Sequence, residues 1–248
     1  MAYCRNGGAQ MKGSVLVTGG TGYLGQAIVK GLSGAGYSVA FTYRNNGDLA
    51  VELEHHLETS GVRGFALRLD LAEETDFESL LERVESKVGL LSSVILSASL
   101  FPRSSEEDEN LAREIFRVNL EGPCLLATAA GRLFSRRGKG RILFVLDTAG
   151  EKIFPGLLAY SVSRAGGFAL VRGLAKKFGP AVQVNAVSPG VIRDPEGMAP
   201  EEKEKLFRKI PAGRTGTVDE VVRTLLFLLE GPSYITGEVI GVDGGYGL

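Results

Sequence analysis

A chain of 248 residues with 44% hydrophobic and 23% charged side chains has the composition of a globular domain, which excludes disordered, collagen-like and coiled-coil proteins. Its 28 basic and 29 acidic side chains nearly balance, so we expect neither nucleic acid nor a membrane surface as a partner. Two cysteines offer no disulfide framework, and no apolar run reaches the roughly 18 residues of a membrane span. Residues 1–10 lack the apolar centre of a signal peptide. We therefore expect a cytoplasmic protein with a disordered tail over residues 1–11 and a single domain over residues 12–248.

Short apolar segments alternate with stretches of helical periodicity along the chain. Consecutive apolar residues, typical of parallel strands buried on both faces, predict seven strands: Ser14–Thr18, Ser38–Tyr43, Gly64–Leu69, Ser93–Ser97, Arg141–Leu146, Val182–Ser188 and Glu238–Val242. Spacings of three and four predict helical faces at Leu24/Ile28/Leu32 and Leu111/Ile115/Val118, while Thr75–Glu78 and Thr217–Glu220 match capping boxes. The alternation predicts an α/β fold, a Rossmann-type doubly wound parallel sheet of about seven strands with helices on both faces.

The first predicted strand runs directly into a glycine-rich turn and then a helix. Because glycine has no Cβ, such a turn lets backbone N–H groups and the helix N-terminus approach an anion, and a dinucleotide pyrophosphate is the natural ligand. The turn and helix start supply the candidate residues Thr18, Gly19, Thr21, Gly22, Tyr23 and Leu24.

The end of the second strand predicts which dinucleotide is bound. An acid there would hold ribose hydroxyls, whereas a base would favour a 2′-phosphate. The chain has Arg44 and no acid before Asp48, so we expect Arg44 to hold the 2′-phosphate and NADPH to be preferred over NADH. The alternative is that Arg44 is an ordinary solvated charge.

Over Met11–Leu248 the chain resembles the classical short-chain dehydrogenase/reductase family. The resemblance lies in the glycine turn and, in chain order, in Asp70-Leu71, Asn119, Tyr160 with a basic residue four positions later, Asn185–Gly190, Ile235–Gly237 and Val242–Gly245. It implies that Tyr160 protonates the atom next to the hydride acceptor and that Asn119 helps arrange its helix and a proton-relay water. It also implies cofactor contacts from Asp70, Leu71, Ser97, Ala98, Tyr160, Arg164, Pro189, Gly190 and Ile192. We expect no metal, since the adjacent His55 and His56 are better explained as a solvated pair. Relatives of this family are dimers or tetramers, which implies a homo-oligomer.

Two departures from the family pattern affect the chemistry. The serine expected 13 residues before the tyrosine is Asp147, and the lysine expected four residues after it is Arg164. Arg164 lies one helical turn from Tyr160, and its positive charge favours the phenolate, but a guanidinium does not release a proton at working pH. An ionised Asp147 only accepts hydrogen bonds, which suits a substrate that presents N–H groups. The alternative is that Asp147 only caps its turn.

An aspartate at this distance from the tyrosine resembles the pteridine reductases. That resemblance extends to Ser99 and Phe101, whose ring would stack on a flat pterin, although Phe101 could also be plain loop packing. Against it, Tyr23 occupies the place of an arginine in the glycine turn. The charged stretch Val191–Arg214 has the composition of a lid over the substrate.

These residues predict an NADPH-dependent reductase of a pterin-like C=N or small carbonyl compound. One alternative is a 3-oxoacyl-carrier-protein reductase, with Lys203, Lys205, Arg208 and Lys209 receiving an acidic carrier. Another is a catalytically impaired cofactor-binding protein acting as a sensor or assembly subunit.

Overall fold

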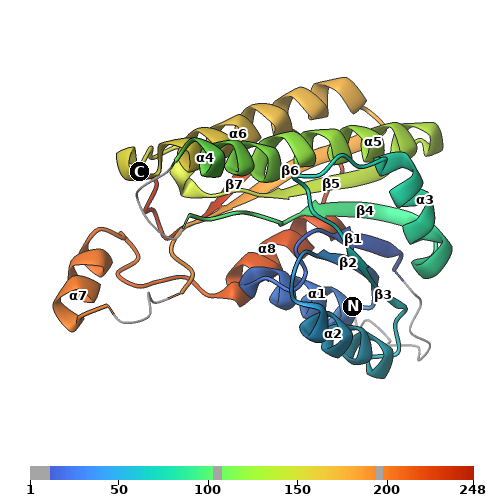
Figure 1. The fold of residues 1–248 in the computed structure, drawn as a ribbon, viewed down its shortest axis with the longest axis horizontal. Helices are drawn as coiled ribbons and strands as arrows, with labels where there is room; N and C mark the ends of the chain where they lie inside the picture. Colours follow the sequence, from blue (N-terminus) through green and yellow to red (C-terminus); the bar gives the residue numbers. More distant parts are fainter. Residues whose placement is uncertain (1–11, 103–107, 194–197) are drawn as a thin grey trace, which may run out of the picture.

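The computed structural model describes residues 12–102, 108–193 and 198–248. Across these residues a wholly parallel sheet of seven strands runs in the order β3-β2-β1-β4-β5-β6-β7 (Figure 1). The strands are β1 (Ser14–Val17), β2 (Ser38–Tyr43), β3 (Gly64–Arg68), β4 (Leu91–Leu96), β5 (Gly140–Val145), β6 (Val182–Pro189) and β7 (Val239–Val242). The chain winds outward from β1 to β3, returns to the other side of β1 and winds outward again. This is the doubly wound topology that the sequence predicts, and its switch point lies between β1 and β4.

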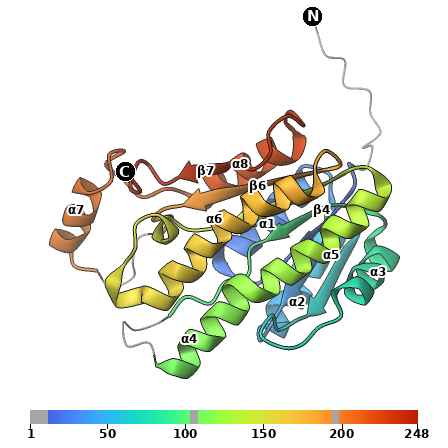
Figure 2. The ribbon, with the colours of Figure 1, turned by 90° about the horizontal axis from the view of Figure 1, so that it is seen from above.

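Helices cover both faces of the sheet (Figure 2). One face packs on α1 (Tyr23–Gly34), α2 (Gly47–Thr59) and α8 (Val218–Glu230), and the other on α3 (Phe77–Val88), α5 (Gly122–Arg137) and α6 (Leu158–Phe178). α4 (Glu109–Phe116) continues through a π-helical turn at Arg117–Glu121 into α5, and α7 (Pro200–Arg208) projects from the body. The two covered faces form two apolar cores, which explains why the strands carry consecutive apolar residues.

All seven predicted strands are present, and their ends differ from the predicted ones by at most two residues. α6 stops at Phe178, with Gly179 as its C-cap. The predicted tail, residues 1–11, lies outside the described residues.

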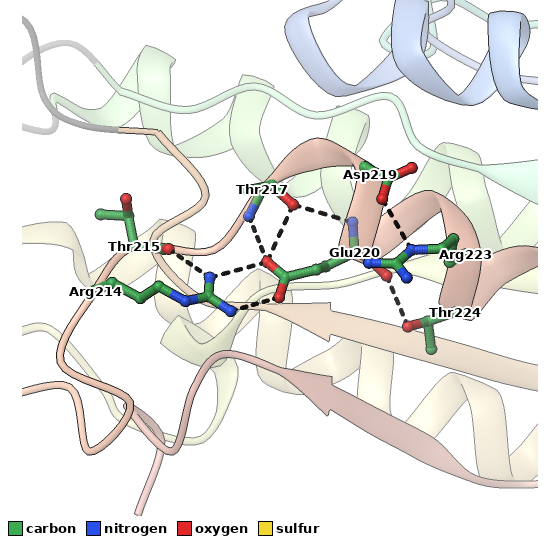
Figure 3. Close-up of polar contacts among 7 residues, drawn as sticks. All are labelled: Arg214, Thr215, Thr217, Asp219, Glu220, Arg223 and Thr224. Atoms are coloured by element: carbon green, nitrogen blue, oxygen red, sulfur yellow. Dashed lines mark hydrogen bonds and ion pairs between the residues drawn. The ribbon is translucent and has the colours of Figure 1, made fainter.

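The two predicted capping boxes have different outcomes. At α8 the box is present: Glu220 N donates to Thr217 Oγ1 over 3.2 Å, and Thr217 N donates back to Glu220 Oε2 over 2.9 Å (Figure 3). At α3 the prediction is wrong by one residue, because Asp76 rather than Thr75 is the N-cap. The Asp76 carboxylate accepts hydrogen bonds from the backbone N–H groups of both Glu78 and Ser79. Its negative charge also interacts favourably with the helix dipole, which the neutral hydroxyl of a threonine does not.

Candidate active site

A cavity of about 930 Å³ opens at the carboxyl ends of the strands, beside the switch point. The glycine turn, the β2 end, the segment after β4 and the start of α6 all contribute to its wall. The lining includes every predicted site residue except Thr18 and Asn119, namely Gly19, Thr21, Gly22, Tyr23, Leu24, Arg44, Asp70, Leu71, Ser97, Ala98, Ser99, Phe101, Asp147, Tyr160, Arg164, Pro189, Gly190 and Ile192.

The glycine turn is packed too tightly for side chains. Gly19 has a φ of +70°, and a Cβ on Gly25 would lie 2.1 Å from the carbonyl oxygen of Gly19. Buried Thr18 is absent from the cavity wall because its Oγ1 faces β4, where it accepts hydrogen bonds from the N–H groups of Ser97 and Ala98 over 3.0 Å each. The turn is thus tied to the segment across the switch point.

The N-terminus of α1 faces the cavity without a competing side chain. Its N-cap is Gly22, no side chain caps it, and its first turn holds no acidic residue. The first backbone N–H groups of a helix have no partner within the helix, and together with the helix dipole they attract an anion.

Asn119 acts on the active site through the backbone rather than from the cavity wall. It is buried in the π-helical turn, where its Oδ1 accepts from Leu100 N over 2.8 Å and its Nδ2 donates to Leu100 O over 3.0 Å. Nδ2 also lies 3.3 Å from Ser163 Oγ on α6. Asn119 therefore fixes the segment after β4 that carries Ser99 and Phe101.

Tyr160 and Asp147 meet in the cavity. Tyr160 Oη donates a hydrogen bond to Asp147 Oδ2 over 2.7 Å, while Asp147 Oδ1 accepts from Ala149 N over 2.8 Å. One oxygen thus caps the turn Thr148–Gly150 and the other receives the phenol, so capping is not the only contact of Asp147. Its acceptance of a hydrogen bond from a substrate N–H stays a prediction. Tyr160 itself is only 3% exposed.

Arg164 lies one turn further along α6 and is also buried. Its guanidinium carbon is 5.0 Å from the centre of the Tyr160 ring, and its Nη2 donates to Ser99 Oγ. Its Nε is buried and has no hydrogen-bond partner among the described residues. A buried donor without a partner is costly, so this atom marks a place where a ligand oxygen would be stabilised.

Burial and the two charged neighbours set the acidity of Tyr160. Burial, which disfavours the phenolate, has the largest effect; the Arg164 cation opposes it, and the Asp147 carboxylate adds to it. Together they raise the pKa of Tyr160 to about 12, so the phenol holds its proton at neutral pH.

Phe101 presents its ring to the same place. Its centre lies 4.9 Å from that of the Tyr160 ring, at an interplanar angle of 79°, and the side chain is 58% exposed. An edge-to-face pair in which the Phe101 side chain is more than half exposed leaves apolar surface available to a flat ligand.

Arg44 is not a free cation. Its Nη1 donates to Glu114 Oε1 of α4 over 2.8 Å and lies 4.0 Å from Asp70 Oδ2. Glu114 was missed by the sequence reasoning, because nothing local in α4 relates it to the end of β2.

Arg193 is a second residue that the sequence reasoning missed. It follows β6, lines the cavity, and places its guanidinium carbon 5.0 Å from the centre of the Tyr23 ring. A cation thus lies beside Tyr23, the position at which the pteridine reductase pattern has an arginine.

The lid expected over Val191–Arg214 remains a prediction. Of its described residues only Ile192 and Arg193 line the cavity, and residues 194–197 lie outside the described part. Within the described ranges no helix is long and apolar enough to cross a membrane. The same ranges bring together no group of three or more His, Cys, Asp or Glu side chains suited to a metal ion.

The fold and the site together define an oxidoreductase of the Rossmann type. The family model for enoyl-(acyl carrier protein) reductases matches residues 22–247, and the chain belongs to the short-chain dehydrogenase/reductase family. Members of this family bind NAD or NADP.

The similar proteins include 3-oxoacyl-[acyl-carrier-protein] reductases and an alternative dihydrofolate reductase. The chain is 34% identical over 246 residues to the 3-oxoacyl-[acyl-carrier-protein] reductase FabG of Aquifex aeolicus, covering 95% of this chain and 98% of that protein. It is 35% identical over 236 residues to the 3-oxoacyl-[acyl-carrier-protein] reductase of Rattus norvegicus, covering 92% and 95%. Among solved structures, the FolM alternative dihydrofolate reductase 1 from Brucella canis, complexed with NADP, matches with a TM-score of 0.84 and 28% identity, covering 96% of each chain.

Proposed function

We propose that this protein is an NADPH-dependent reductase of a pterin-like C=N compound or of a small carbonyl compound. The observation that carries the proposal is the 2.7 Å hydrogen bond from Tyr160 to Asp147 inside the cavity at the switch point. The FolM neighbour, an alternative dihydrofolate reductase by name, supports the pterin-like substrate.

The residues present fit a phosphorylated nicotinamide dinucleotide. The uncapped N-terminus of α1 would receive the pyrophosphate, and Arg44 would receive a 2′-phosphate. The buried Nε of Arg164, which no described residue satisfies, would donate to a ribose hydroxyl. When bound, the nicotinamide supplies the hydride.

In the proposed reaction Tyr160 is the proton donor. With its pKa at about 12 it holds the proton at Oη until the substrate atom becomes basic enough to take it. The Arg164 cation, which lies over the ring, then stabilises the phenolate. Asp147 accepts a hydrogen bond from a substrate N–H, and solvent water, which reaches the site because Asp147 is only partly buried, returns a proton to the phenolate.

Phe101 would favour a flat substrate over an extended one. Its ring centre lies 4.9 Å from that of the proton donor Tyr160, and pairing of aromatic rings contributes about 0.5–1.5 kcal/mol beyond burial. Ser99, held by Arg164, lies two residues away on the same segment.

The second candidate is a 3-oxoacyl-carrier-protein reductase, which the bacterial and rat relatives favour by name. The carrier site suggested by the sequence is weaker in the structure. α7 carries Glu201, Glu202 and Glu204 among its lysines, and Arg208 is paired with Glu204 over 2.8 Å. The basic side chains of α7 thus do not form a surface of one sign.

A substrate comparison distinguishes the candidates. NADPH oxidation is followed with dihydrobiopterin and with an acetoacetyl thioester, in the natural chain and in Asp147→Ser, which restores the family serine. We expect the natural chain to use the pterin, and Asp147→Ser to lose the pterin and favour the thioester. Activity with the thioester alone supports the second candidate. NADPH binding without turnover, restored by Arg164→Lys, supports the impaired cofactor-binding protein.

We also propose a cytoplasmic homo-oligomer. A groove of about 590 Å³ on the outer side of α5 and α6 is lined mainly by apolar side chains, among them Phe116, Leu120 and Leu170. Burial of such a face against a second copy would remove apolar surface from water. Light scattering should give the mass of a dimer or tetramer, and the mass of a monomer would contradict the proposal.

A further inference from the structure

Arg44, Glu114 and Asp70 form a charged cluster at the adenosine end of the cavity. The three residues come from the end of β2, from α4 and from the turn after β3. Arg44 Nη1 donates to Glu114 Oε1 over 2.8 Å, and Asp70 Oδ2 lies 4.0 Å from the same nitrogen. One cation is therefore shared by two carboxylates.

The pair spans the crevice in which a dinucleotide would lie. β2 and β4 flank β1 in the sheet, and α4 follows β4 along the chain, so the Arg44–Glu114 hydrogen bond bridges the carboxyl end of β1. Arg44 and Asp70 line the cavity directly. Asp70 is already engaged, since its Oδ1 accepts from Ala72 N over 2.9 Å.

Binding of a 2′-phosphate at this cluster would cost electrostatic free energy. Binding of a 2′-hydroxyl would not carry this cost. A phosphate monoester carries about −1.5 to −2 charges at neutral pH. It must draw the Arg44 guanidinium from Glu114, or share it, while lying near two carboxylates of like sign. A ribose hydroxyl instead donates to a carboxylate without competing for the cation.

We propose that Glu114 is a specificity-determining residue that weakens the preference of this site for the 2′-phosphorylated dinucleotide. It does so by holding Arg44 and by adding negative charge near the phosphate position. This inference rests on the proposed cofactor site and deepens it.

The test compares two nucleotides that differ only in the 2′-phosphate. Dissociation constants of 2′,5′-ADP and 5′-AMP are measured by calorimetry on the full chain and on Glu114→Gln. Exposed ion pairs are worth about 0.2–1 kcal/mol, so we expect Glu114→Gln to tighten 2′,5′-ADP by roughly 1.5- to 5-fold and to leave 5′-AMP nearly unchanged. The gain should shrink at high salt, because the side chains of Arg44 and Glu114 are 37% and 42% exposed.

Glu109→Gln is the matched control. It removes the same charge from the same helix, but Glu109 pairs with Arg113 instead of Arg44. In an Arg44→Gln background, the effect of Glu114→Gln on 2′,5′-ADP should become smaller, since there is no guanidinium left to release.

Two failures are distinguishable. Binding of both nucleotides with an unchanged ratio in Glu114→Gln, or an equal change in Glu109→Gln, would overturn the role of Glu114 alone. Absence of binding by every nucleotide, NADP+ included, in the natural chain would overturn the proposed cofactor site and this inference with it.

Discussion

Asp147 and Glu220 each accept hydrogen bonds at the start of a helical segment, but in opposite surroundings. Glu220 faces Arg214, whose two Nη atoms donate to its carboxylate over 2.7 and 3.1 Å, and Thr217 donates to it as well (Figure 3). These donors, with the Arg214 hydrogen bond first, lower the pKa of Glu220 to about 2. Asp147 instead faces the buried phenol of Tyr160, whose pKa is raised to about 12.

The different donors to these two carboxylates indicate different roles. Glu220 stabilises the start of a helix, whereas Asp147 contacts the proposed proton donor. Arg214 stays protonated, and Glu220 stays ionised at neutral pH because its pKa is lowered to about 2, so the ion pair fixes the N-terminal end of α8. The donor to Asp147 is neutral, and its proton lies between two oxygens in a cavity. The guanidinium carbon of Arg164 lies 5.0 Å from the centre of the Tyr160 ring.

The largest expected effect comes from removing the phenol oxygen. Tyr160→Phe keeps the ring packing but deletes the proton, and general acid catalysis contributes about 10²–10⁴-fold, so kcat should fall by that factor. The dissociation constant for NADP+ should change little. Tyr234→Phe, at a fully exposed position, is the control. Turnover that survives in Tyr160→Phe would show that this tyrosine is not the proton donor. It would also remove the proposed catalytic role of its partner Asp147.

The acidity of Tyr160 gives a more direct measurement. Asp147→Asn removes a negative charge next to the phenol, so the pKa of Tyr160 should fall, whereas Arg164→Gln should raise it. The difference in tyrosinate absorbance between each protein and its Tyr160→Phe counterpart reports this pKa. Since the folded pKa of about 12 exceeds the ordinary value of 10.0, the stabilisation from Tyr160 is present below pH 10 and lost as the pH rises toward 12. An unchanged pKa in Asp147→Asn would show that the carboxylate does not act on the phenol.

The smallest effect is expected at the cap of α8. Glu220→Gln should lower the free energy of unfolding by about 0.5–1 kcal/mol at neutral pH, the usual range for a cap or an exposed ion pair. Because the pKa of Glu220 is lowered from 4.5 to about 2, this advantage over the variant is present above pH 4.5 and lost as the pH falls toward 2. Urea unfolding at several pH values measures it. Asp219→Asn, which breaks the exposed pair with Arg223, should change stability less.

The fold was predictable because its signals are local. Consecutive apolar residues marked each strand, and the glycine turn after β1 located the switch point. The error at Thr75 shows the limit of such signals, since Thr75 and Asp76 both match an N-cap and only the backbone path decides which one serves.

Which residues line the cavity was predictable where the family resemblance supplied positions, as for Tyr160, Asp147 and Arg164. What these residues contact was not. The partner of Arg44 is Glu114, 70 residues away along the chain, and Arg193 reaches Tyr23 across the crevice. Contacts between distant elements depend on how helices pack, which leaves no pattern in a single sequence.

The double hydrogen bond from Asn119 to Leu100 has a consequence for how substrate range could diversify. The backbone N–H and C=O of Leu100 are both hydrogen-bonded to the buried Asn119 side chain. These bonds fix the backbone conformation at Leu100 independently of the neighbouring side chains. Phe101, which is 58% exposed, can then be replaced without moving the backbone that carries it. Libraries randomised at this position should retain folded, cofactor-competent proteins while altering which compounds are reduced.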